Sequence, residues 1–248
     1  QKNNAEYVMG SSSNFVNDVM LYNNLGAGSV YNKPESNATQ WSLMSYLARI
    51  NYTLKHKYLF SVNARVDGSS RFGTNNKYGF FPSASAGWRI SEEAFMEPVK
   101  EVISNLKLRA SYGFTGNTEI GVYESLATLG TSNWILGNQL VSGFFPNKIP
   151  NPDLKWERTG QFDIGLDLGL FNNRFSLEFD YYRRDTKEML VNVDVPASVG
   201  LASVETNVGS VRNSGLDFTV KWEDSFKDFR YGIRLTGTTI KNEVTNLG

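Results

Sequence analysis

The sequence predicts an all-β protein, an antiparallel up-and-down segment of a transmembrane β-barrel that contributes about eight or nine strands to a larger barrel. Three observations support this fold class. Apolar and polar residues alternate strictly along one long segment. Short and long connections alternate between the predicted strands, and aromatic residues gather near both strand ends.

The longest alternating segment runs from Trp156 to Phe171. One parity is apolar and the other is polar; the apolar set is Trp156, Phe162, Ile164, Leu166, Leu168 and Leu170, and the polar set is Glu157, Thr159, Gln161, Asp163 and Asp167. A strand of an ordinary globular sheet has about 5–6 residues, whereas a strand that crosses a bilayer has about 9–11. This segment is therefore long enough to cross a bilayer with one apolar face.

Seven further segments alternate in the same way. They cover residues 44–53, 58–67, 80–90, 106–114, 175–181, 216–222 and 229–236. Residues 1–40 are rich in Asn, Ser and Gly and show little periodicity, so we expect loop there with at most one strand.

The connections between these strands alternate in length. Short ones lie near residues 54–57, 172–174 and 224–228, and long ones near 67–79, 115–155 and 185–213. Every second connection of an up-and-down sheet lies at the same end, so the long loops gather at one end and the tight turns at the other. Outer-membrane barrels show this asymmetry, with short periplasmic turns and long extracellular loops.

One short helix is expected in the periplasmic connection 91–105. Ser91 is a candidate N-cap, and Glu92 and Glu93 place acidic groups in the first turn, where they favour a helix. Pro98 limits or kinks this helix because proline lacks a backbone N–H.

Aromatic residues bracket the aliphatic middle of the strands. One group lies at the short-turn end (Tyr52, Tyr58, Phe171, Phe175, Trp222 and Phe229), and a second at the long-loop end (Phe80, Tyr112, Phe114, Tyr181 and Tyr182). Two aromatic belts suit the two interfaces of a bilayer. We therefore expect Leu166 and Phe179 to face outer-membrane lipid, and Asp163 and Asp180 to face the lumen.

Alternation alone does not identify lipid as the apolar partner. A soluble sandwich also buries one face against a second sheet and wets the other. The alternative is therefore a soluble all-β carbohydrate-binding module, with Ile164, Leu177 and Val220 in a dry interior. Strand length, loop asymmetry and the aromatic belts favour the membrane.

Composition excludes several classes of function. Lys and Arg together number 25, and so do Asp and Glu, so no basic field attracts nucleic acid. The chain has no cysteine, which rules out a thiolate nucleophile, and one histidine, His56, which rules out a multi-His metal site. A Ser-His triad is not expected either, because His56 is predicted in a turn at the periplasmic end of the strands. The sequence gives little support for a glycosidase pair such as Asp163 with Asp180, because many other carboxylates on the polar parity could be paired in the same way. We predict no enzyme activity, no catalytic residues, no metal site and no cofactor.

Four aromatic residues in the long connection 115–155 are candidates for ligand binding. They are Tyr123, Trp134, Phe144 and Phe145. Aromatic rings on exposed loops can stack on sugars or peptides, although such residues also pack among themselves within compact loops.

Several segments resemble one known family in collinear order. They are Lys57-Tyr58-Leu59, Arg65 to Phe72 (RVDGSSRF), Phe81 to Glu93 (FPSASAGWRISEE), Leu106 to Asn117, Asn151 to Glu157 (NPDLKWE), and Asn207 to Asp217. Together they resemble the barrel of SusC/RagA-type TonB-dependent transporters of Bacteroidetes.

This resemblance implies a role as well as a fold. The family forms a large outer-membrane barrel that holds a plug in its lumen, and it imports oligosaccharides or peptides into Gram-negative cells. A SusD-like lipoprotein caps the barrel, and TonB pulls on the plug. We expect residues 1–248 to be part of a single barrel domain, with the plug domain and the terminal barrel strands absent from this chain.

Overall fold

The computed structural model describes residues 1–17, 19, 23–196, 198, 200–201 and 203–247. The chain divides into two compact units, residues 1–43 and 44–248, and each is described by itself. Strand β4 (Glu35–Leu54) contributes to both. Among the described residues, no helix has the length and apolar character needed to span a membrane.

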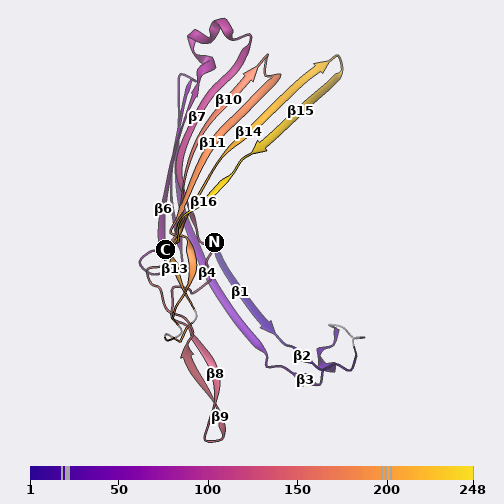
Figure 1. Cartoon of the computed structure of the whole chain (residues 1–248), viewed down its shortest axis with the longest axis vertical. Helices are drawn as coiled ribbons and strands as arrows, with labels where there is room; N and C mark the ends of the chain where they lie inside the picture. The colour runs from indigo at the N-terminus through magenta and orange to yellow at the C-terminus, as the bar shows by residue number, and fades with distance from the viewer. Residues whose placement is uncertain (18, 20–22, 197, 199, 202, 248) are drawn as a thin grey trace. The chain divides into compact units, whose positions relative to one another are not determined.

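One antiparallel sheet dominates the second unit. Its order is β4-β5-β6-β7-β10-β11-β14-β15, which confirms the predicted meander, and Figure 1 shows its long strands side by side. The strands after β4 are β5 (Tyr58–Ser69), β6 (Tyr78–Arg89), β7 (Ile103–Asn117), β10 (Glu157–Leu170), β11 (Phe175–Lys187), β14 (Ser210–Phe226) and β15 (Phe229–Thr238). A further strand, β16 (Lys241–Asn246), pairs with residues 210–214 of β14, whereas β15 pairs with residues 217–226 of the same strand.

Tight turns join neighbouring strands at one end of this sheet, as predicted. The backbone angle φ is positive at His56 (56°), Asn172 (58°), Asn173 (62°) and Lys227 (53°). Two-residue hairpins need such angles because their twist then matches that of the flanking strands, and asparagine tolerates them better than most residues. The long connections leave from the opposite end, so the predicted asymmetry is confirmed.

The connection after β6 is helical, but its details differ from the prediction. It contains two 3₁₀ helices, η3 (Ile90–Glu92) and η4 (Ala94–Val99), rather than one α-helix starting after Ser91. Ser91 lies buried inside η3 and caps nothing. The carboxylate of Glu93 binds side chains of β5 and β6 instead, and Pro98 sits within η4.

Two predicted strand ends were wrong. The connection expected near residues 67–79 begins later, because Asp67 and Gly68 pair with Gly79 and Tyr78 and β5 continues to Ser69. Trp156 lies outside β10, with 6% of its surface exposed, and packs on other aromatic rings. Residue type misleads at both places because the strand ends depend on pairing and packing with residues of other segments.

The long connections and the N-terminal region contain strands that periodicity did not reveal. Hairpins are formed by β8 (Leu129–Leu136) with β9 (Gln139–Pro146), and by β12 (Leu190–Asp194) with β13 (Ser203–Asn207). In the first unit, β1 (Lys2–Met9) pairs with residues 35–42 of β4, β2 (Ser12–Ser13) pairs with β3 (Val30–Tyr31), and η2 (Leu25–Ala27) lies between them. The prediction of loop with at most one strand for residues 1–40 was therefore wrong, because these strands are exposed on both faces and carry no apolar alternation.

The large sheet of the second unit has one apolar and one polar face. Directly paired residues of neighbouring strands share a face, and Leu108, Leu166, Phe179 and Phe218 form one such apolar row. Ile164 is 40% exposed, and Leu177 and Val220 are half-buried. The dry interior expected of a soluble sandwich is therefore not found at these residues.

The buried apolar residues of the described chain lie elsewhere. They are Phe72, Phe81, Met96, Ile120, Leu154 and Trp156. All but Met96 come from the long-loop end of strands or from the long loops themselves. The apolar core of this segment thus sits where the long loops leave the sheet.

Candidate functional site

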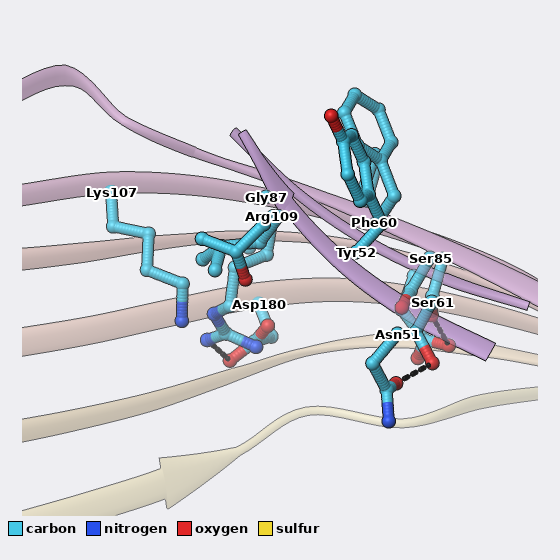
Figure 2. A pocket seen from close by; sticks show the side chains of 16 residues that line it. Asn51, Tyr52, Phe60, Ser61, Ser85, Gly87, Lys107, Arg109 and Asp180 are labelled. Atoms are coloured by element: carbon cyan, nitrogen blue, oxygen red, sulfur yellow. Dashed lines mark hydrogen bonds and ion pairs between the residues drawn. The ribbon is translucent and has the colours of Figure 1, made fainter. Parts of the chain in front are cut away.

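An ion-pair network runs across the polar face of the sheet. Arg109 on β7 donates from Nε to Asp167 Oδ1 at 2.8 Å and from Nη2 to Asp180 Oδ2 at 3.1 Å. Lys107 Nζ lies 3.3 Å from Asp167 Oδ2. The three strands β7, β10 and β11 are therefore linked by charge as well as by their backbone ladders. Figure 2 shows the ion pair between Arg109 and Asp180.

A glycine makes the contact between Arg109 and Asp180 possible. Gly165 on β10 lies between Arg109 and Asp180 in the same row. A Cβ at Gly165 would lie 2.0 Å from Asp180 Oδ1 and 3.0 Å from Arg109 Cζ. The guanidinium therefore crosses β10 in the space that a side chain would take.

A second polar chain continues along the same face. Ser111 Oγ donates to Asp163 Oδ2 at 3.2 Å, and Gln161 Nε2 donates to Asp163 Oδ1 at 2.8 Å. Arg184 Nε donates to Gln161 Oε1 at 3.1 Å. These contacts satisfy side chains that a wide, wet lumen would expose.

Asp163 and Asp180 share the predicted face but do not oppose each other. Asp163 pairs with Tyr182, and Asp180 pairs with Gly165. Tyr182 therefore lies on the polar face, so its predicted place in the outer aromatic belt was wrong. The Arg109 contact leaves Asp180 as an ion-pair partner and not as one half of a carboxylate pair.

A hollow of about 320 Å³ lies on the polar face of the sheet. Figure 2 shows Asn51, Ser61, Lys107 and Arg109 on one side of the strands. Tyr52 and Phe60 point to the other side. A neighbouring groove of about 750 Å³ continues over β11 and β14, past Arg184 and Asp217.

At the long-loop end, an aromatic cluster holds the loops to the sheet. The ring of Trp156 lies 5.0 Å from that of Phe72 and 5.3 Å from that of Phe81, measured between centroids. Its indole Nε1 donates to the carbonyl of Lys77 at 3.2 Å. Loops 70–77 and 147–156 therefore pack together; we call this cluster, with Leu154 and Ile120, the loop base.

Side-chain amides extend the loop base to the third long loop. Asn207 Nδ2 donates to the carbonyls of Lys155 (2.7 Å) and Glu188 (2.9 Å), and its Oδ1 accepts from Lys155 N at 2.9 Å. Asn151 Nδ2 donates to the carbonyl of Glu205 at 3.0 Å. All three long loops are thus cross-linked close to the sheet.

Two carboxyl groups meet beside the loop base. Burial raises the pKa of Glu205, and the nearby charge of Glu124 raises it further. Glu124 is itself paired with Lys148. Glu205 therefore keeps its proton to a higher pH than an ordinary glutamic acid side chain.

A carboxylate also anchors the short-turn end. Glu93 accepts hydrogen bonds from Lys57 Nζ (2.9 Å), Tyr58 OH (2.8 Å) and Trp88 Nε1 (3.1 Å). These donors hold the pKa of Glu93 at about 2, Lys57 having the largest effect. The connection between β6 and β7 is therefore fixed to the ends of β5 and β6.

The four aromatic ligand candidates fall in different places. Trp134 on β8 and Phe145 on β9 lie on one face of the β8–β9 hairpin, whereas Phe144 lies on the opposite face, paired with Thr131. Tyr123 lies in the turn region before the hairpin, with φ of 73°. The structure brings Trp134 and Phe145 together and separates the other two from them.

Sequence reasoning missed the residues that shape these sites. Gly165 and the hairpin glycines at positions 130 and 143 have no side chain, and Asn207 stood out only as the first residue of a segment that resembles the family. One signal was available: Gly137-Asn138 between two apolar runs is a hairpin signature, and both residues have positive φ. The contacts of Asn207 join residues 52 apart in sequence, which no local pattern encodes.

The fold and its two unlike faces define a wall segment of a β-barrel. Residues 2–247 match the family model described as "TonB dependent receptor-like, beta-barrel". The chain belongs to this family, and the resemblance inferred from its sequence segments is confirmed.

Three relatives illustrate the match. The chain is 37% identical to TonB-dependent receptor P3 of Formosa agariphila over 248 residues, all of this chain and 25% of the relative. It is 38% identical to TonB-dependent receptor SusC of Bacteroides thetaiotaomicron, over 85% of this chain and 21% of the relative. The structure titled "Structure of the RagAB peptide transporter" superposes with a TM-score of 0.86 at 32% identity, over 99% of this chain and 27% of that one. The chain spans about a quarter of the length of the curated relatives that it matches over its full extent.

Proposed function

We propose that the whole protein imports oligosaccharides or peptides across the outer membrane of a Gram-negative bacterium. The observation that carries this proposal is the match to SusC over 85% of the chain and to the RagAB peptide transporter over 99% of it. The relatives are named as receptors and transporters, so the proposed role involves no catalysis.

In this proposal the large sheet forms part of the barrel wall. Exposed apolar residues such as Leu108, Ile164 and Phe179 face lipid, because an apolar band on the outer surface is what a bilayer requires. The network of Arg109, Asp167 and Asp180 faces the wet lumen, where paired charges are tolerated.

The same proposal assigns partners and domains. Residues 1–248 belong to one barrel domain, which a plug and further strands complete in the whole protein. A SusD-like lipoprotein covers the extracellular end, and TonB supplies energy through the plug. The open groove lined by Arg184, Asn213 and Asp217 offers polar contacts to a plug.

A matched pair of arginine substitutions tests the orientation of the sheet. Leu166→Arg places a charge on the apolar face, and Thr219→Arg places one on the polar face opposite Glu178. In the full-length protein we expect Leu166→Arg to lower the free energy of unfolding by about 2–4 kcal/mol if the residue lies near the bilayer midplane. Thr219→Arg should leave it nearly unchanged. Equal effects, measured by urea unfolding in lipid vesicles, would argue against the orientation.

Deleting the gene tests the function. We expect the wild-type protein to be found in the outer-membrane fraction, and the deletion strain to lose TonB-dependent growth on at least one polysaccharide or peptide source. Normal growth of the deletion strain on every source, or recovery of the protein in the soluble fraction without detergent, would overturn the proposal.

A further inference from the structure

The β8–β9 hairpin carries two aromatic rings that rest on glycines. The indole of Trp134 lies 2.8 Å from the position that a Cβ of Gly143 would take, and Phe145 Cζ lies 2.8 Å from that of Gly130. Each glycine belongs to the strand opposite its ring. Each glycine therefore leaves room for part of the ring to lie close to the backbone of the opposite strand.

Both rings are exposed to solvent despite this support. Trp134 is 61% exposed and Phe145 is 42% exposed. Gly143 pairs with Ser132 and Gly130 with Phe145, so the rings rest on successive rows of the same hairpin face. Two rows are about 7 Å apart along a strand. The rings thus form an extended two-ring platform rather than a closed aromatic core.

The surroundings of the platform are uncharged. Residues 125–147 contain no Asp, Glu, Lys or Arg, although charged residues make up 20% of the chain. The nearest charged residues in sequence, Glu124 and Lys148, pair with each other at the base of the hairpin. The polar side chains on the face of Trp134 and Phe145 are neutral, namely those of Ser132 and Gln139.

This chemistry suits one class of ligand. A neutral sugar ring presents a C–H face that stacks on an aromatic ring, and its hydroxyls bond to neutral polar groups. A short peptide brings charged termini and side chains, for which this hairpin offers no partner among residues 125–147. The absence of charge therefore favours a neutral saccharide over a peptide.

We propose that the Trp134–Phe145 face of the β8–β9 hairpin is a binding platform for neutral oligosaccharides. The proposal rests on the proposed import function and goes further, because it names the ligand class and the residues that hold it. Phe144, on the opposite face of the same hairpin, is not part of the platform. Tyr123 is not part of it either.

The hairpin supplies its own control. Phe144 is 74% exposed and adjacent to Phe145, so Phe144→Ala removes a ring of the same kind from the other face. The probes are neutral hexasaccharides (maltohexaose, cellohexaose, xylohexaose and mannohexaose) and a set of hexapeptides. Binding to the full-length protein in detergent is measured by calorimetry.

We expect at least one hexasaccharide to bind. Trp134→Ala and Phe145→Ala should each weaken that binding by about fivefold to tenfold, the range for loss of one aromatic contact, and Phe144→Ala should change it less than about twofold. Gly143→Val should weaken it as well, because its side chain displaces the indole of Trp134.

Other outcomes overturn the platform. They are binding of no hexasaccharide, an equal loss in Phe144→Ala, or a loss of hexapeptide binding alone. If Trp134→Ala or Phe145→Ala abolishes copurification with the SusD-like lipoprotein but leaves saccharide binding intact, the face contacts that protein instead of a saccharide. Growth assays separate the two proposals: if Trp134→Ala and Phe145→Ala cells keep full uptake of the imported nutrient, the platform fails while the import function stands.

Discussion

The loop base and the β8–β9 hairpin lie in the same long connections but are built in opposite ways. In the loop base, Trp156 is buried between Phe72 and Phe81, and Asn207 joins two loops through their backbone. In the hairpin, the hydrogen bonds of described residues 129–146 stay within the hairpin, and its aromatic rings are exposed.

This difference separates the residues that build the barrel from those available for recognition. The segments that carry the family resemblance, such as Asn151 to Glu157, Arg65 to Phe72 and Asn207, meet in the loop base and bond to one another. Their side chains are occupied by structural contacts. The hairpin, with no such ties, leaves its side chains free to contact a ligand.

The largest expected effect comes from replacing one tryptophan of each region with alanine. Trp156→Ala should lower the free energy of unfolding of the full-length protein by about 3–5 kcal/mol, because it empties a buried aromatic site. Trp134→Ala should change it by less than about 0.5 kcal/mol, because the ring is exposed. Urea unfolding in vesicles measures both, and similar values would remove the distinction between the regions.

A smaller effect is expected from the amides. Asn207→Ala removes three hydrogen bonds to the backbones of Lys155 and Glu188, so we expect a loss of about 1–3 kcal/mol and faster hydrogen exchange in residues 188–209. Asn133→Ala in the hairpin removes one exposed bond with Ser142 and should be nearly neutral. Unchanged exchange in Asn207→Ala would show that aromatic packing alone holds the loop.

The smallest effect should appear in the pH dependence of the loop base. The pKa of Glu205 is raised in the folded protein, so its contribution to stability is greatest below the ordinary value of 4.5 and is lost as the pH rises through the folded pKa. Protease nicking in residues 188–209 should therefore increase with pH across that window. Glu205→Gln should flatten this pH dependence. The rate at which the protease nicks the β8–β9 hairpin should be the same in the wild type and in Glu205→Gln.

A dependence that survives in Glu205→Gln would assign the pH response to another group. Glu124 is the nearest alternative, since it also faces Glu205 and pairs with Lys148. Glu124→Gln then decides between the two carboxyl groups.

Strand positions and faces were predictable because they depend on local alternation. The placing of Leu108, Leu166 and Phe179 on one face, and of Asp163 and Asp180 on the other, followed from residue parity alone. The tight turns at His56 and Asn172 were equally local, since turn residues determine them.

The sequence by itself determined the meander and its two faces, because side chains of a strand alternate between faces from one residue to the next. Its collinear segments also determined the family. Only the tertiary structure decided that Trp156 leaves the strand for a buried cluster, that Gly165 makes room for Arg109, and that Trp134 and Phe145 share a face without Phe144. Each of these depends on which residue of a different segment lies opposite, and that register arises from pairing between segments rather than from any one of them.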